Sequence, residues 1–332
     1  MLSVFKGTGP GVIAATVIAL LLLWIHPLAY PAGPGDLIYE VQPMPLYEFL
    51  KVILGHSPLP GVITSFLFLS FMLFLLVHFN TTVFFINQRT FLPAIVYLLL
   101  TSLLPDNQVL NPVLPAALLL MLAMMRIMDA YRKQGVAYNF FDAAFLIGTG
   151  SMLYAGLLWF GVLTIVGIAI LRRVTLSEIL LSLIGILTPY LIVAGFYFVS
   201  GREVMELLEV TGKNLFEKAV SFEFSPEQVV ALISSGILLI VSIVFLMARI
   251  HAKKIRSRKT FFLLLWGLLI SVPVYFAIPS VSVEIMWIAA IPASYIITHY
   301  FVFSSSRVMP RLIFSGLVLM VVMVQLFSLF NH

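Results

Sequence analysis

Apolar stretches close to 20 residues long dominate the chain, and this is the length that an α-helix needs to cross the hydrocarbon core of a bilayer. Short polar segments separate nine of them, at residues 11–28, 59–85, 90–104, 112–131, 175–200, 226–248, 260–278, 281–303 and 310–330. Only 10% of the 332 residues are charged, against roughly a quarter in soluble domains. The sequence therefore predicts an all-α, polytopic transmembrane helix bundle that forms a single integral membrane domain over residues 1–332.

A tenth apolar block, at residues 140–171, is too long for a single crossing. Its 32 residues would form a straight helix of about 48 Å, whereas the hydrocarbon core is about 30 Å thick. Basic pairs at 132–133 and 172–173 flank the block, and such pairs mark cytoplasmic helix ends. We therefore expect the chain to reverse near residues 154–156, as a full or a re-entrant hairpin. Two crossings here bring the predicted total to eleven.

The positions of lysine and arginine predict the orientation of the bundle. With eleven crossings, fifteen of the 19 Lys and Arg residues fall on one side, and eleven of the 14 acidic residues fall on the other. Because cytoplasmic loops retain basic residues, we expect a cytoplasmic N-terminus and a C-terminus outside, in a bacterial cytoplasmic (inner) membrane. Residues 26–31, which follow the first apolar stretch, are bulky and broken by proline, so we interpret that stretch as a retained helix rather than a signal peptide.

Three loops stand out in this topology. The outer loops 27–58 and 201–225 each contain apolar residues at helical spacing with charges on other faces, which predicts amphipathic helices resting on the outer interface. The cytoplasmic loop 249–259 carries six Lys and Arg residues in eleven positions. We expect it to contact anionic lipid headgroups, each charge contributing about 1 kcal/mol. An acidic cytoplasmic protein is the alternative partner, and the positive charge does not imply nucleic acid.

The first outer loop holds the best candidates for catalysis. Asp36 follows a Pro-Gly pair, and Glu40 comes four residues later. Carboxylates held beside a membrane can act as a general base or bind a divalent cation; the alternative is that both are solvated loop acids. Cysteine is absent, and no spacing typical of a metal, phosphate-loop or dinucleotide site is present. The sequence therefore predicts neither a metal site nor a cofactor.

Polar residues also gather at the predicted cytoplasmic helix ends. Arg126 and Asp129 are three positions apart on one helix and can pair, while Asp142 and Glu178 lie near the starts of later helices. With the basic pair at 172–173 they could form a cytoplasmic polar cluster. The alternative is that these are ordinary helix-end charges that pair and extend toward the headgroups.

The overall layout resembles the integral-membrane glycosyltransferases that use polyprenyl-phosphate sugars, which have many helices and an acidic residue and interfacial helices in the first outer loop. The resemblance implies that Asp36 is the base and that Arg202 or Lys213 meets a lipid phosphate. It covers about the first 60 residues and the general architecture. The chain departs from the family because no tandem acidic pair follows the first helix, and we expect no soluble C-terminal domain. The segment 87–89, Asn-Gln-Arg, is also similar to one in uncharacterised bacterial inner-membrane proteins.

Three classes of function stay open. A transferase would act on a lipid-linked substrate at the outer face. A non-catalytic subunit or scaffold of an envelope assembly would explain the sparse polar residues and would have envelope proteins as partners. A transporter or lipid translocator would explain the short apolar segments, since short or broken helices often line substrate cavities, although no charged residue lies at a predicted helix midpoint.

Overall fold

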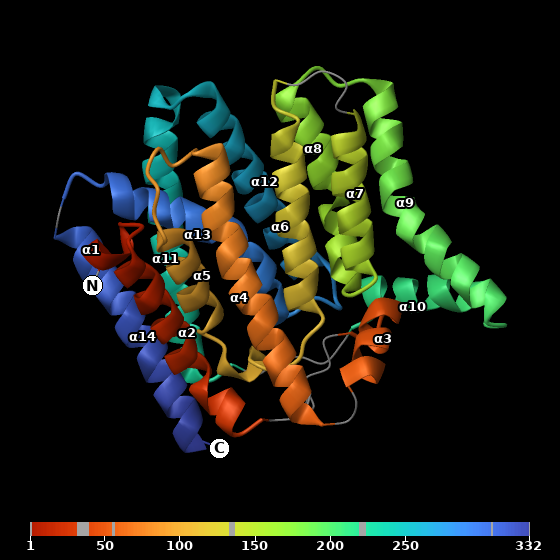
Figure 1. The fold of residues 1–332 in the computed structure, drawn as a ribbon, viewed down its shortest axis with the longest axis horizontal. Coiled ribbons are helices and arrows are strands. Elements are labelled where there is room, and N and C mark those ends of the chain that lie inside the picture. Colours follow the sequence, from red (N-terminus) through yellow and green to blue (C-terminus); the bar gives the residue numbers. More distant parts are fainter. Residues whose placement is uncertain are drawn as a thin grey trace.

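A computed structural model describes residues 2–31, 40–54, 57–132, 137–218, 224–306 and 308–331, and within these ranges every regular element is a helix (Figure 1). Among them, seven helices are long and apolar enough to cross a membrane: α2 (Pro10–Ala29), α4 (Pro58–Val83), α9 (Leu176–Val199), α11 (Pro226–Arg249), α12 (Ile255–Ala277), α13 (Met286–Phe303) with the short η4 (Val283–Ile285) before it, and α14 (Met309–Asn331). The prediction of an all-α fold is confirmed in this coarser form. The lengths and apolar composition of these seven helices are those expected of an integral membrane protein.

Shorter helices lie between the long ones: α5 (Leu92–Thr101), α6 (Val113–Asp129), α7 (Ala137–Ser151) and α8 (Val162–Leu171). The apolar block at 140–171 divides into α7, the 3-10 helix η2 (Ala155–Gly161) and α8, and Figure 1 shows the chain reversing between α7 and η2. The helix therefore stops within two or three residues of the predicted reversal at 154–156. Three further helices are only a single turn long: α1 (Leu2–Phe5), η1 (Pro105–Asn107) and η3 (Ile250–Ala252).

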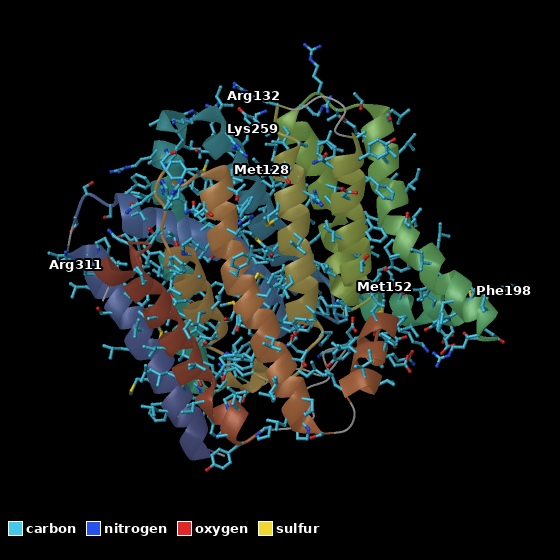
Figure 2. The ribbon with its side chains drawn as sticks, viewed as in Figure 1. Met128, Arg132, Met152, Phe198, Lys259 and Arg311 are labelled. Atoms are coloured by element: carbon cyan, nitrogen blue, oxygen red, sulfur yellow. The ribbon has the colours of Figure 1, made fainter. Side chains whose placement is uncertain are left out.

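Helix α13 forms the centre of the bundle, with α5, α6, α11 and α12 packed against it. Its Tyr295 hydroxyl donates a 2.7 Å hydrogen bond to the Leu76 carbonyl of α4. The Tyr97 hydroxyl of α5 donates in turn to the Trp287 carbonyl at 3.0 Å. The outer helices α2, α9 and α14 instead expose apolar side chains, and Phe198 at the far end of α9 is 78% exposed (Figure 2). Apolar surfaces of this extent are expected where helices face lipid.

Glycines set the close contact between α7 and α9. A Cβ atom on Gly148 of α7 would lie 2.5 Å from the Ile186 carbonyl oxygen, and one on Gly185 of α9 would lie 2.6 Å from the Phe141 carbonyl oxygen. Both neighbours are backbone atoms, which cannot move aside as the end of a flexible side chain can. Small residues thus allow two helix backbones to touch, as they commonly do in membrane bundles.

Helices α3 (Pro45–Leu54) and α10 (Val204–Phe216) form in the two loops where amphipathic helices are predicted. On α10, Leu207, Thr211 and Leu215 of the predicted apolar stripe are buried, whereas Val204 and Leu208 of the same stripe are 38% and 58% exposed. On α3 Tyr47 is buried, whereas Phe49 is 63% exposed. Figure 1 shows α3 and α10 close together beside the turn that joins α7 to η2. These two helices and that turn enclose the candidate site.

Candidate functional site

Glu40 lies just before α3 and is buried, with 7% of its surface exposed. Its Oε1 atom accepts a 2.6 Å hydrogen bond from the backbone N–H of Ala155, the first residue of η2. Its Oε2 atom is also buried and has no hydrogen-bond partner among the described residues. A buried carboxylate oxygen without a partner is costly, so this atom calls for a functional or structural reason.

The segment that carries Glu40 is fixed by hydrogen bonds to distant parts of the chain. Asn214 of α10 binds the backbone of Gln42 twice, accepting from its N–H at 3.0 Å and donating to its carbonyl at 2.6 Å. The Leu46 N–H donates to the carbonyl of Met152 at 3.0 Å. Met152, labelled in Figure 2, lies at the end of α7 near α3 and α10, and Met44 and Leu207 belong to the same buried apolar cluster. Glu40 is therefore held in a defined position by α10 and by the α7–η2 turn.

We expect Asn214→Ala to lower the free energy of unfolding by about 1–3 kcal/mol, because both backbone groups of Gln42 lose their partner. Unfolding in detergent measures this loss, and limited proteolysis of residues 40–44 reports whether the segment is released. Lys213→Ala is the control, since Lys213 pairs with Glu209 on the surface of α10 and exposed pairs of this kind contribute little to stability. Equal stability of the two variants would show that Asn214 does not fix the segment.

A second buried carboxylate, Glu284 of η4, lies at the same turn. Its Oε1 atom accepts hydrogen bonds from the Tyr154 hydroxyl at 3.0 Å and from the Ser282 N–H at 2.8 Å, and its surface is 2% exposed. Tyr154 and Ala155 are consecutive, so one turn contacts both acids. We call Glu40 and Glu284 the carboxylate pair. Sequence reasoning did not single out Glu284, although its position as the only acid in the apolar stretch 281–303 is a signal that such a residue has a function.

The surroundings of Glu40 favour its protonated form. Burial raises the pKa of the Glu40 carboxyl well above its ordinary value, and the neighbouring Glu284 charge acts in the same direction. The backbone N–H groups of Ala155 and Met44 oppose this shift in part. A carboxylate with a raised pKa is a stronger base than a solvated one, and this is the property that general-base catalysis near neutral pH requires. No group of three or more His, Cys, Asp or Glu side chains in the described ranges is arranged to hold a metal ion.

The other residues predicted for this face do not touch Glu40. Asp36 lies outside the described residues. Arg202, just before α10, is exposed, lies 3.9 Å from the Glu48 carboxylate and stacks 5.5 Å from the centre of the Tyr197 ring. Lys213 pairs with Glu209 at 2.6 Å. Both cations lie on or beside α10, the helix that holds the Glu40 segment.

At the opposite end of the bundle, only part of the predicted polar cluster comes together. Arg172, at the end of α8, forms a 3.0 Å ion pair with Glu178, which is buried in the first turn of α9. Arg126 is exposed, Asp129 and Asp142 are half-buried, and none of these three forms an ion pair in the described part of the chain. The ion pair neutralises the buried Glu178, a structural role that needs no substrate.

Comparison with protein-family models, curated proteins and solved structures finds no match to this chain. The carboxylate pair is assembled from three regions far apart in sequence, around residues 40, 154 and 284, and it offers two acids and a tyrosine hydroxyl in a buried setting.

Proposed function

We propose that the chain is a membrane-embedded transferase that acts on a lipid-linked substrate, a polyprenyl-phosphate sugar, at the outer face of a bacterial inner membrane. The observation that carries this proposal is Glu40, a buried acid with one oxygen fixed on Ala155 and the other without a partner in the described residues. Such an arrangement orients a carboxylate while leaving one of its oxygens without a hydrogen bond, so that this oxygen can accept a proton. The architecture that resembles polyprenyl-phosphate-dependent glycosyltransferases supplies the substrate class.

In the proposed reaction Glu40 acts as general base. Its Oε2 atom takes the proton from an acceptor hydroxyl as that oxygen bonds to C1 of the sugar. The bond between C1 and the phosphate oxygen breaks at the same time, and polyprenyl phosphate leaves with the electron pair. Arg202 and Lys213, on the same side of the bundle as Glu40, are the proposed contacts of the lipid phosphate.

This role requires Glu40 to face the outside, and we propose a topology of eleven crossings with a cytoplasmic N-terminus. The seven long helices supply seven crossings, and α5, α6, α7 and the η2–α8 segment supply four. With this count the carboxylate pair, α3 and α10 fall on one side and the basic segment 249–259 falls on the other, as the retention of basic residues in the cytoplasm requires.

Close packing beside the carboxylate pair favours a transferase over a transporter. Ser151, at the end of α7, is fully buried and shares a 2.9 Å hydrogen bond with the Tyr190 hydroxyl. The neighbouring Gly148 contacts the backbone of α9, so no room is left between these helices for a passing substrate. A transport path needs a hydrated or substrate-sized cavity at such a helix break.

Transfer of a labelled sugar tests the proposal. Membranes containing the chain would be supplied with a panel of polyprenyl-phosphate sugars, and release of polyprenyl phosphate would be measured with transfer of the label. We expect Glu40→Gln to lower the rate by roughly 100-fold or more, the usual contribution of a general base. Glu206→Gln, which removes an exposed acid from α10, is the control and should keep the rate.

Two outcomes would contradict a transferase. In the first, no donor of the panel gives more sugar transfer than it gives in membranes that lack the chain, and this result would favour a scaffold role. The other is an undiminished rate in Glu40→Gln, which would remove the base from the reaction. Correct folding of Glu40→Gln, checked by its unfolding midpoint, ensures that a lost rate reports chemistry.

A further inference from the structure

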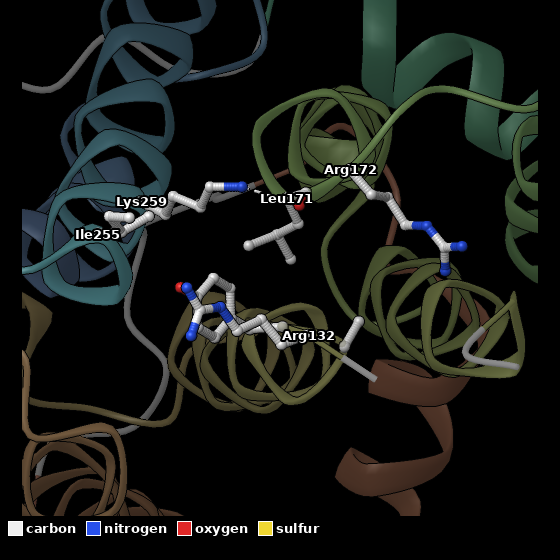
Figure 3. Close-up of a pocket in the computed structure, with 7 residues that line it drawn as sticks. Arg132, Leu171, Arg172, Ile255 and Lys259 are labelled. Carbon is white, nitrogen blue, oxygen red and sulfur yellow. Dashed lines mark hydrogen bonds between the residues drawn. The ribbon is translucent and has the colours of Figure 1, made fainter. Parts of the chain in front are cut away.

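A basic pocket of about 460 Å³ lies at the opposite end of the bundle from the carboxylate pair. It opens between the ends of α6 and α8 and the start of α12 (Figure 3). Its walls combine the cations Arg132, Arg172 and Lys259 with Tyr131 and the apolar Leu171 and Ile255. Among the described residues, no acidic side chain lines it.

Two of these cations act together, and the third is already neutralised. The Arg132 guanidinium lies 5.4 Å from the centre of the Tyr131 ring, and the Lys259 ammonium lies 5.7 Å from the same ring. Figure 3 shows Arg132 and Lys259 on either side of the opening, with Arg172 directed away. The Arg172 guanidinium is paired with Glu178 at 3.0 Å, so it adds little net charge to the pocket. Two positive charges therefore face the opening without an acidic partner in the lining.

The Lys259 ammonium is fixed within the pocket. It donates a 2.8 Å hydrogen bond to the Leu171 carbonyl, one of the last carbonyls of α8, which have no partner within the helix. An ammonium has three donors, so two stay available for a ligand. The Tyr131 ring lies within cation–π distance of both Arg132 and Lys259 and supports both cations. The pocket is thus organised before any ligand arrives.

We propose that this pocket binds a phosphate group, supplied by the headgroup of an anionic membrane lipid. An arginine and a lysine with free donors are the side chains that recognise phosphate oxygens. The apolar walls, Leu171 and Ile255, suit the glycerol and first methylenes of a lipid better than a free ion. The pocket also lies at helix ends, the level at which headgroups meet a membrane bundle, where basic pockets between helices bind anionic lipids. The pocket takes Ile255 and Lys259 from the segment 249–259 and combines them with Arg132 into one defined site, whereas the rest of that segment is expected to attract headgroups diffusely.

Lipid binding to the purified full-length chain tests the proposal. Native mass spectrometry in detergent would compare added phosphatidylglycerol with phosphatidylcholine, and inorganic phosphate would be added as competitor. We expect phosphatidylglycerol to bind more tightly, and Arg132→Gln with Lys259→Gln to weaken it by roughly 5-fold for each lost cation. The control is Arg126→Gln with Arg173→Gln, which removes two exposed cations outside both the pocket and the segment 249–259 and should change the affinity less than about 2-fold.

The single variant Arg132→Gln guards against loss of folding, because the Arg132 side chain is exposed and donates no hydrogen bond in the described structure. It alone should weaken phosphatidylglycerol binding by roughly 5-fold. If inorganic phosphate competed at the same concentration as the lipid, and phosphatidylglycerol bound no more tightly than phosphatidylcholine, the pocket would still be a phosphate site. The proposal that a lipid headgroup supplies the phosphate would then be overturned. Equal loss in the pocket and control pairs would overturn the pocket itself.

Discussion

Replacing Gly185 by alanine is expected to destabilise the bundle by about 3 kcal/mol, near the upper end of what overpacking usually costs. The added Cβ would lie 2.6 Å from the Phe141 carbonyl oxygen and 2.8 Å from the Cβ atom of Ala144. Neither neighbour can turn away, because one is backbone and the other is a methyl group fixed to a helix. The variant must therefore separate α7 from α9 along their whole contact or kink one of them. Unfolding in detergent measures the loss.

Gly195→Ala is the matched control on the same helix. A Cβ at Gly195 would have no neighbour within 4 Å among the described residues, so the substitution adds a methyl group to an open surface and gains helix propensity. Gly148→Ala tests the contact from the other side, since its Cβ would lie 2.5 Å from the Ile186 carbonyl oxygen. We expect the unfolding midpoints of Gly185→Ala and Gly148→Ala to lie well below that of Gly195→Ala. Similar midpoints for all three variants would show that α7 and α9 can separate at little cost.

The fold was predictable to the extent that it follows from apolar length. Stretches near 20 residues predict helices, and the excess length of the block at 140–171 predicts the break that the structure has between α7 and η2. The helical spacing of apolar residues in 201–225 likewise predicts α10, and it predicts its buried face in part, since Leu207 and Leu215 are buried but Leu208 is exposed. Contacts between helices could not be predicted in this way. Gly185 and Gly195 lie in similarly apolar sequence, and only the packing shows that one touches a backbone and the other touches nothing.

The candidate site was predictable only in part, and for a physical reason. Glu40 stands in a loop rich in proline and glycine, where sequence predicts solvation as readily as function. Its burial depends on Ala155 and on Asn214, which are more than 100 positions away, and no local pattern encodes such pairings. Glu284 and Tyr154 are similarly joined across 130 positions. The basic pocket could not be foreseen either, because Arg132 and Lys259 come together only when α6 and α12 are placed side by side.

The stability of Glu40→Gln is expected to rise relative to the unsubstituted protein as pH increases. Burial raises the pKa of Glu40 in the folded state above its ordinary value of 4.5, so the folded protein keeps a proton that the unfolded chain has released. The stability linked to this proton is therefore fully present below pH 4.5 and is lost as pH rises through the raised pKa. Within that window each pH unit costs about 1.4 kcal/mol. Glutamine carries no charge at any pH and escapes this cost.

Unfolding midpoints of the protein and of Glu40→Gln in detergent, measured between pH 5 and pH 8, test this expectation without any substrate. The difference between them should widen with pH in favour of the variant, whereas Glu206→Gln, which removes an exposed acid of α10, should show no such trend. A widening difference together with a lost transfer rate would mean that Glu40 costs stability and supports reaction, as groups at active sites often do. A difference that stays constant with pH would mean that water reaches Glu40, and the buried base on which the transferase proposal depends would not exist.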